Sequence, residues 1–163
     1  MRLINKIAKH VLVCTVILQA PASTLPISVT VQPVPGPVKT GSELRVKVTT
    51  TNTSDHEIRF ARGFGEQEFD FDIEVREEKG QTPPPTETYR QLKDHPSSRR
   101  GSYSTYVLEP GKSFDEDLVV TKLYKITQPG KYTISVTRGQ RPMWQTLGKG
   151  GATSNSITVT VTP

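Results

Sequence analysis

Tyr103-Ser-Thr-Tyr-Val-Leu-Glu-Pro-Gly-Lys-Ser-Phe114 and Gln128-Pro-Gly-Lys-Tyr-Thr-Ile-Ser-Val-Thr137 are the two stretches that decide the fold of this chain. In each of them a Pro-Gly-Lys turn adjoins residues that alternate between apolar and polar. Alternation with a period of two puts every second side chain on one face, which only a pleated strand does. The sequence therefore predicts a strand, a turn, a strand, a corner and a strand. These elements would form the C-terminal half of an antiparallel sandwich.

Similar alternation runs through the rest of the chain. Strands are predicted at residues 27–32, 43–49, 57–61, 68–75, 102–108, 114–120, 131–138 and 156–161, with a further short strand at 87–92. No helix longer than one turn is predicted. About seven to nine short strands at this spacing indicate an all-β fold, an immunoglobulin-like or fibronectin-like antiparallel β-sandwich.

Two local patterns refine this sandwich. Residues 33–37 hold three prolines, and because proline cannot donate to a central ladder, the segment is expected at a sheet edge or at a crossing between sheets. Gly130-Lys131-Tyr132 fits a tyrosine corner, in which a tyrosine near the start of the penultimate strand bonds its hydroxyl to nearby backbone. A tyrosine that simply packs in the core is the alternative.

The N-terminus is predicted to be a signal peptide spanning residues 1–22. Three basic residues accompany an apolar run at 11–18, and Ala20-Pro21-Ala22 supplies the small-x-small pattern of a cleavage site. The apolar run is far shorter than the roughly 20 residues that a membrane-spanning helix needs. The mature chain, residues 23–163, is expected to be a single domain without a transmembrane segment, located in the periplasm or outside the cell.

Removal of this leader changes the charge and the cysteine content. It takes away three of the 21 Lys and Arg residues, which leaves 18 basic and 16 acidic residues and a net charge of +2. A nearly balanced charge does not imply a nucleic-acid partner. The only cysteine, Cys14, leaves with the leader. The mature protein is therefore expected to have no disulfide, and its core must hold by apolar burial alone.

Two motifs carry a resemblance to known exported proteins: Leu108-Glu-Pro-Gly-Lys-Ser113 and Leu123-Tyr-Lys-Ile-Thr-Gln-Pro-Gly-Lys-Tyr-Thr-Ile134. They resemble the immunoglobulin-like N-terminal pro-domains of deuterolysin-type zinc peptidases, and stand-alone bacterial secreted proteins of unknown function. The His-Glu-x-x-His motif of the peptidase half is absent from this sequence. The resemblance therefore implies a non-catalytic module, such as an inhibitor, a chaperone or a binding domain.

Charged and nucleophilic residues give no clear reaction centre. Five acidic residues at two-residue spacing are interpreted as a solvated strand face whose neighbouring strands carry Arg45, Lys47, Arg59 and Arg62; they are Glu66, Glu68, Asp70, Asp72 and Glu74. A straight strand cannot converge the six to eight oxygens of a calcium site. His95 lies in a polar loop beside Asp94, and two histidines after processing are too few for zinc. No catalytic residue, metal or cofactor is predicted.

The long loop 139–155, with its preceding residue, is the best candidate for a binding site. It holds the only tryptophan, and its proposed contact residues are Arg138, Arg141, Met143 and Trp144. Loops at sandwich ends commonly carry binding, and Trp, Arg and Met are enriched in interface cores. In the alternative interpretation, Trp144 and Leu147 fold back and cap the sandwich.

The sequence thus favours a non-enzymatic module that recognises another extracytoplasmic protein. Regulation of a peptidase is the finer role that the resemblance implies. The alternative is a structural or adhesive envelope module that binds carbohydrate through the basic and aromatic residues of the region 89–103, which include Tyr89, Arg90, Lys93, Arg99, Arg100 and Tyr103.

Overall fold

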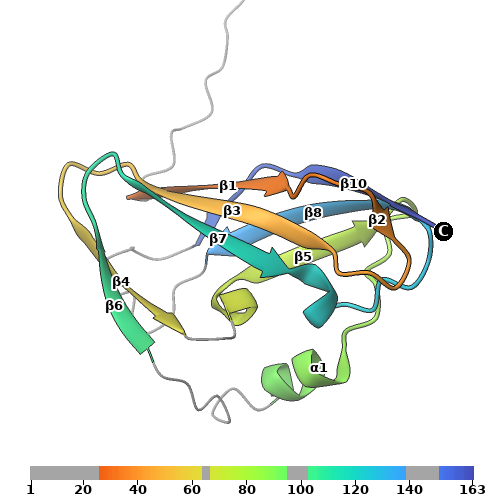
Figure 1. The fold of residues 1–163 in the computed structure, drawn as a ribbon. Coiled ribbons are helices and arrows are strands. Elements are labelled where there is room, and N and C mark those ends of the chain that lie inside the picture. Colours follow the sequence, from red (N-terminus) through yellow and green to blue (C-terminus); the bar gives the residue numbers. More distant parts are fainter. Residues whose placement is uncertain (1–25, 64–66, 95–102, 139–150) are drawn as a thin grey trace, which may run out of the picture.

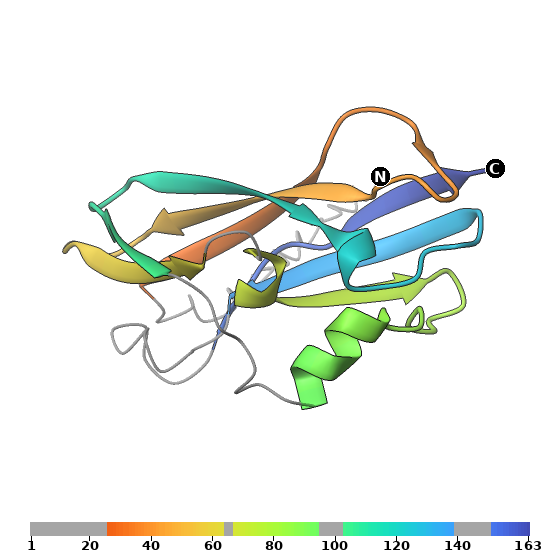
Figure 2. The same ribbon diagram turned by 60° about the horizontal axis from the view of Figure 1, so that its bottom comes forward.

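Two antiparallel sheets lie against each other in the computed structural model, which describes residues 26–63, 67–94, 103–138 and 151–163 (Figures 1 and 2). The first sheet has the order β1–β3–β7, with strands Ile27–Pro33, Arg45–Asn52 and Ser113–Val119. The second has the order β2–β10–β8–β5, with strands Val38–Lys39, Ile157–Thr162, Gly130–Arg138 and Asp72–Glu77. This arrangement confirms the predicted all-β sandwich.

Three further strands complete the described sheets. The pair β4–β6 joins Ile58–Gly63 to Tyr103–Leu108, and β9 (Ala152–Thr153) pairs with β8. The strand order within each main sheet matches the A–B–E and C–F–G arrangement of the immunoglobulin fold. Between β5 and β7 the chain forms a helix and β6, and no described strand lies beside β7 on the side away from β3.

The proline-rich segment lies where the chain changes sheets, as predicted. β1 pairs with β3 in the first sheet, and β2 pairs in parallel with β10 in the second. The prolines between them remove N–H donors at the place where neither ladder needs them. The crossing joins the two layers close to the N-terminal end of the described chain.

Alternating side chains from both sheets fill the core. Every second residue of β3 and β8 is buried, among them Val46, Val48, Ile134 and Val136. The intervening residues face water. The period of two seen in the sequence is therefore the pattern of burial in the structure.

Two predicted strands are wrong in whole or in part. Residues Glu87–Asp94 form the helix α1, two turns long, whose first turn is capped by Thr86 Oγ1 accepting from the Tyr89 N–H at 3.2 Å. A Thr cap followed by Glu is a helix start signal, so the prediction that no helix exceeds one turn is also wrong. Residues Gln67–Asp70 form a 3₁₀ turn, η1, and the following strand starts only at Asp72.

The tyrosine corner is confirmed. The hydroxyl of Tyr132 donates to the carbonyl oxygen of Gln128 at 2.8 Å, four residues upstream. The ring is buried and belongs to the core cluster. The bond therefore ties the corner before β8 to the strand that follows it.

A buried asparagine holds the bend between the β3–β7 and β4–β6 ladders. The Asn52 amide nitrogen donates to the carbonyl oxygens of His56 and Leu108, each at 2.8 Å, and Asn52 Oδ1 accepts from the Ser54 N–H at 2.9 Å. Asn52-Thr53-Ser54 matches the N-glycosylation pattern. A buried and bonded side chain is not an accessible acceptor, so the turn serves the fold.

Side chains cap two of the sheet edges. Asn155 binds Val31 of β1 as a further strand would, with Oδ1 accepting from the N–H at 3.0 Å and the amide donating to the carbonyl at 3.1 Å. On β5, the Tyr124 hydroxyl donates to the Ile73 carbonyl at 2.8 Å. Each cap occupies backbone groups with which another chain could otherwise pair. Within the described ranges, no helix has the length and apolarity needed to cross a bilayer.

Removing the corner bond should weaken the fold without changing it. We expect Tyr132→Phe to lower the free energy of unfolding by about 1 kcal/mol, the typical net contribution of one hydrogen bond. Tyr106→Phe is the matched control, since no hydrogen bond of its hydroxyl occurs within the described residues. Urea denaturation would measure both, and equal losses in the two variants would contradict a specific role for the corner.

Alkaline pH should act on the fold through Tyr124. Burial, then the nearby Tyr89, Glu74 and Asp72, raises the pKa of Tyr124 well above its ordinary value. The stabilisation is therefore complete below about pH 10, the unfolded pKa, and is lost as the pH rises toward the folded one. We expect the urea midpoint to fall above about pH 10, and to fall less steeply in Tyr124→Phe. Parallel curves for the two proteins would contradict this assignment.

Candidate functional site

Arg138, predicted as an exposed contact residue, is instead buried between the sheets. It is the last residue of β8, and its side chain is 1% exposed. The guanidinium Nη1 lies 2.8 Å from Glu116 Oε2 on β7 and 2.7 Å from Thr50 Oγ1 on β3. The rings of Phe60 and Phe71 lie 5.1 and 4.6 Å from its Cζ. The expectation that Arg138 contacts a partner is corrected, because its charge is already used inside the core.

The other three predicted contact residues, Arg141, Met143 and Trp144, lie outside the described residues. What the structure describes is the base of their loop. Arg138 pairs with Ala152 and Thr137 with Thr153 in the β8–β9 ladder. The two ends of the loop are therefore held side by side, and its binding role stays a prediction.

The basic and aromatic region 89–103 is only partly as expected. Tyr89 is buried and packs against Phe69 and Tyr124, with ring centroids 6.2 and 5.5 Å from its own. Arg90 pairs with Glu87 on the same helix at 2.7 Å. Arg99, Arg100 and the Tyr103 side chain lie outside the description. Tyr89 is thus a core residue and cannot serve as an exposed stacking platform for a sugar.

The acidic series does not face the basic strands that were predicted to neutralise it. Asp72 and Glu74 are exposed on β5, but β5 pairs with β8, where they lie opposite Thr137 and Ser135. The interpretation failed because β5 belongs to the second sheet, whereas β3 belongs to the first and β4 pairs with β6. The basic residues take other partners, namely Glu43 for Arg45, Asp115 for Lys47 and Glu57 for Arg59. Glu66 and the Arg62 side chain lie outside the description.

Glu68, another member of that series, is buried at the edge of the first sheet. Its side chain is 3% exposed, and Oε1 accepts from the Val119 N–H and from Lys122 Nζ, each at 3.1 Å. Its Oε2 is buried and has no hydrogen-bond partner in the described part of the chain. Sequence alone could not find this residue, since it shares its two-residue spacing with Asp72 and Glu74, which are exposed.

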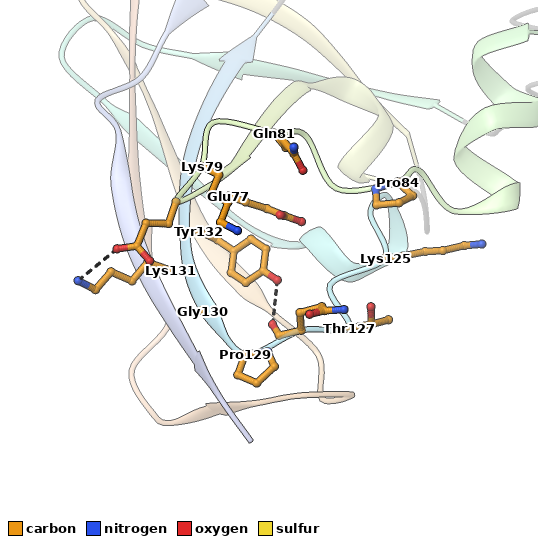
Figure 3. Close-up of a pocket in the computed structure, with 12 residues that line it drawn as sticks. Glu77, Lys79, Gln81, Pro84, Lys125, Thr127, Pro129, Gly130, Lys131 and Tyr132 are labelled. Atoms are coloured by element: carbon orange, nitrogen blue, oxygen red, sulfur yellow. Dashed lines mark hydrogen bonds and ion pairs between the residues drawn. The ribbon is translucent and has the colours of Figure 1, made fainter.

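A surface pocket of about 490 Å³ lies next to the tyrosine corner (Figure 3). The turn after β5 and the segment that leads into β8 form its walls, and the Tyr132 hydroxyl points into it while bonded to the Gln128 carbonyl. Burial first, and Glu77 second, raise the pKa of Tyr132, which keeps the hydroxyl protonated. The charged lining residues are Glu77, Glu78, Lys79, Lys125 and Lys131.

The chemistry of this pocket is that of a polar contact surface. Lys131 Nζ lies 3.9 Å from Glu78 Oε1, so charges of both signs already meet on the rim. Its lining contains no histidine, cysteine or serine. In the described residues generally, no group of three or more His, Cys, Asp or Glu side chains is placed to hold a metal ion.

These features describe an immunoglobulin-like β-sandwich whose two sheets are joined by a buried ion pair. The chain belongs to the family described as flagellar collar protein C, N-terminal domain, which matches residues 38–162. The match starts at β2 and runs to the end of β10, so it covers nearly the whole sandwich. A search of curated proteins gave no match. None of the comparisons supports the resemblance to peptidase pro-domains.

Solved structures with a similar shape are distant. A β-glucosidase from Erythrobacter marinus is 13% identical over 84% of this chain and 15% of its own, with a TM-score of 0.42. A Listeria innocua β-glucosidase in complex with glucose is 15% identical over 86% of this chain and 16% of its own, with a TM-score of 0.41. This chain spans about 15% of the length of these enzymes. Likeness at this level carries no argument about activity.

The buried ion pair makes a prediction about stability. Glu116→Leu removes a counter-charge from the buried guanidinium of Arg138, and we expect it to lower the free energy of unfolding by about 3–5 kcal/mol. Adding Arg138→Met should recover most of that loss, because the double variant buries neither charge. Glu57→Leu, which breaks the exposed pair with Arg59, should cost under about 1 kcal/mol. Guanidinium denaturation of the four proteins gives the comparison, and strictly additive losses would contradict direct coupling of Arg138 and Glu116.

Proposed function

We propose that this chain is an exported, non-catalytic module of the bacterial cell envelope that binds another protein there. The observation that carries the proposal is the family match over residues 38–162. The family is named after a flagellar collar protein. We therefore expect a module of this kind to contact other proteins rather than a small substrate.

Two features of the chain support this role. The sandwich is a rigid scaffold with its sheets joined through Arg138 and Glu116, and rigid scaffolds commonly present loops and edges to partners. The predicted leader at residues 1–22 would bring the protein to the periplasm or the outside of the cell. A chain without cysteine after that cleavage needs no oxidising compartment to fold.

Two finer roles, regulation of a peptidase and binding of carbohydrate, have less support. Regulation of a peptidase rests on the resemblance of two short motifs, which the comparisons do not strengthen. Carbohydrate binding through the region 89–103 loses Tyr89, which is part of the core. Recognition of an envelope protein is therefore the function that we favour.

Cross-linking in cells tests the proposal. A photoreactive residue would replace one exposed side chain on each of three faces: Val107 on β6, which is 50% exposed, Thr160 on β10, and Lys125 beside the pocket. We expect the protein in the extracytoplasmic fraction with its N-terminus after residue 22. We also expect one face to cross-link strongly to an envelope protein while the other faces serve as matched controls. A cytoplasmic location, or equal weak labelling from all three faces, would contradict the proposal.

A further inference from the structure

One stretch of β7 has backbone groups that point away from its sheet. The Asn52 N–H donates to the Lys112 carbonyl at 3.0 Å, and the Val120 N–H donates to the Leu44 carbonyl at 2.8 Å. Antiparallel ladders alternate between bonded and non-bonded pairs, so even-numbered residues of β7 bond to β3. The N–H and C=O groups of the odd-numbered residues therefore face outward, and these residues are Ser113, Asp115, Asp117 and Val119.

Among the described residues, only Glu68 closes this edge, and it does so at one end. Its Oε1 accepts from the Val119 N–H at 3.1 Å, which confirms the outward direction and ends the open stretch there. No described residue pairs with the outward backbone groups of Ser113, Asp115 and Asp117. The immunoglobulin fold has its fourth strand of this sheet at this position. By contrast, Asn155 and Tyr124 cap β1 and β5.

We propose that the Ser113–Asp117 edge of β7 binds an extended basic segment of another protein, which adds to the first sheet as a fourth strand. Main-chain hydrogen bonds supply the affinity in such strand addition, and alternate side chains supply the specificity. The stretch offers three N–H and three C=O groups over about 14 Å of strand. This site rests on the proposed role in protein recognition and gives that role a location.

Charge identifies the kind of segment. Asp115 and Asp117 are exposed on the outer face of the edge. Asp115 accepts a hydrogen bond from Thr49 Oγ1 at 2.7 Å and lies 3.9 Å from Lys47 Nζ, whereas no described residue pairs with the Asp117 carboxylate. Behind the edge, Glu68 Oε2 is a buried carboxylate oxygen without a described hydrogen-bond partner. A strand with Lys or Arg opposite the two aspartates gains cross-strand ion pairs, whereas acidic residues there are repelled.

The same charges argue against a second copy of this chain. Two β7 strands paired antiparallel about Asp115 would place that residue opposite its own equivalent, and Asp117 opposite Ser113. Like charges directly opposite each other destabilise a pair of strands. The inner face of the edge is apolar, because the half-buried side chains of Phe114 and Tyr106 lie there. The expected segment therefore alternates basic residues outward with apolar residues inward.

Amide hydrogen exchange of the purified full chain tests the site directly. The probe is a blocked Lys-Val-Lys-Val-Lys peptide at millimolar concentration, with a Glu-Val-Glu-Val-Glu peptide as its matched control. We expect the basic peptide to slow exchange at the amides of Ser113, Asp115 and Asp117 at least fivefold, and the acidic peptide to have no effect. Amides of β8, which are bonded on both sides, should not change.

Three variants at one position separate backbone pairing from charge. Asp117→Pro removes an outward N–H but no bond to β3, so the protein should fold and lose the protection. Asp117→Asn keeps the N–H, and we expect peptide affinity about two- to fivefold weaker, the size of one cross-strand ion pair. Asp117→Lys should weaken it further. Unchanged exchange in β8 verifies the fold of each variant.

Several results would overturn the site. They are the absence of protection with the basic peptide, equal protection by both peptides, and undiminished protection in Asp117→Pro. Protection that grows with protein concentration alone would mean that a second copy covers the edge. If the basic peptide gives no protection, the aspartates serve only to keep the edge from aggregating. Cross-linking in cells reads out the envelope role separately, so either idea can fail while the other stands.

Discussion

The ion pair between Arg138 and Glu116 is the interaction on which this sandwich depends most. It joins β8 of the second sheet to β7 of the first, and Thr50 brings in β3. Antibody domains join their two sheets at the core with a disulfide. The only cysteine of this chain, Cys14, precedes every described strand, so the described sandwich has no disulfide, and a charge pair connects its two sheets instead.

A buried pair of this kind sets position more than it adds stability, because desolvation offsets much of the attraction. The guanidinium lies over the rings of Phe60 and Phe71, at the end of β8. At the same position Arg138 pairs with Ala152 in the β8–β9 ladder, which is the base of the loop 139–150. A residue that the sequence suggests as a contact for a partner instead anchors the strand end from which that loop starts.

The sequence was sufficient for the fold class because alternation reports burial, and burial is what a sandwich requires of each strand. It also indicated the crossing at residues 33–37 and the corner at Tyr132, since proline and the Pro-Gly-Lys-Tyr pattern act locally. It missed the helix α1 because the region looked like a short strand and the cap at Thr86 was overlooked. Local patterns can be read from one chain segment at a time.

Pairings between segments could not be read in that way. The positions of Arg138 and Glu68 depend on strands that lie 22 and 51 residues away in the chain. A charged residue at the end of a strand looks the same whether it faces water or a counter-charge from the opposite sheet. The acidic series failed for this reason, since its neighbours were inferred from sequence order and the sandwich reorders them.

The parallel pairing of β2 with β10 has a consequence for how the protein is made. The Thr40 N–H donates to the Thr162 carbonyl at 2.8 Å, so one sheet uses residues 122 positions apart in the chain. The ribosome delivers Val38–Lys39 long before Ile157–Thr162. The second sheet therefore stays incomplete in the nascent chain until β10 has been synthesised, so it cannot form strand by strand in the order of synthesis.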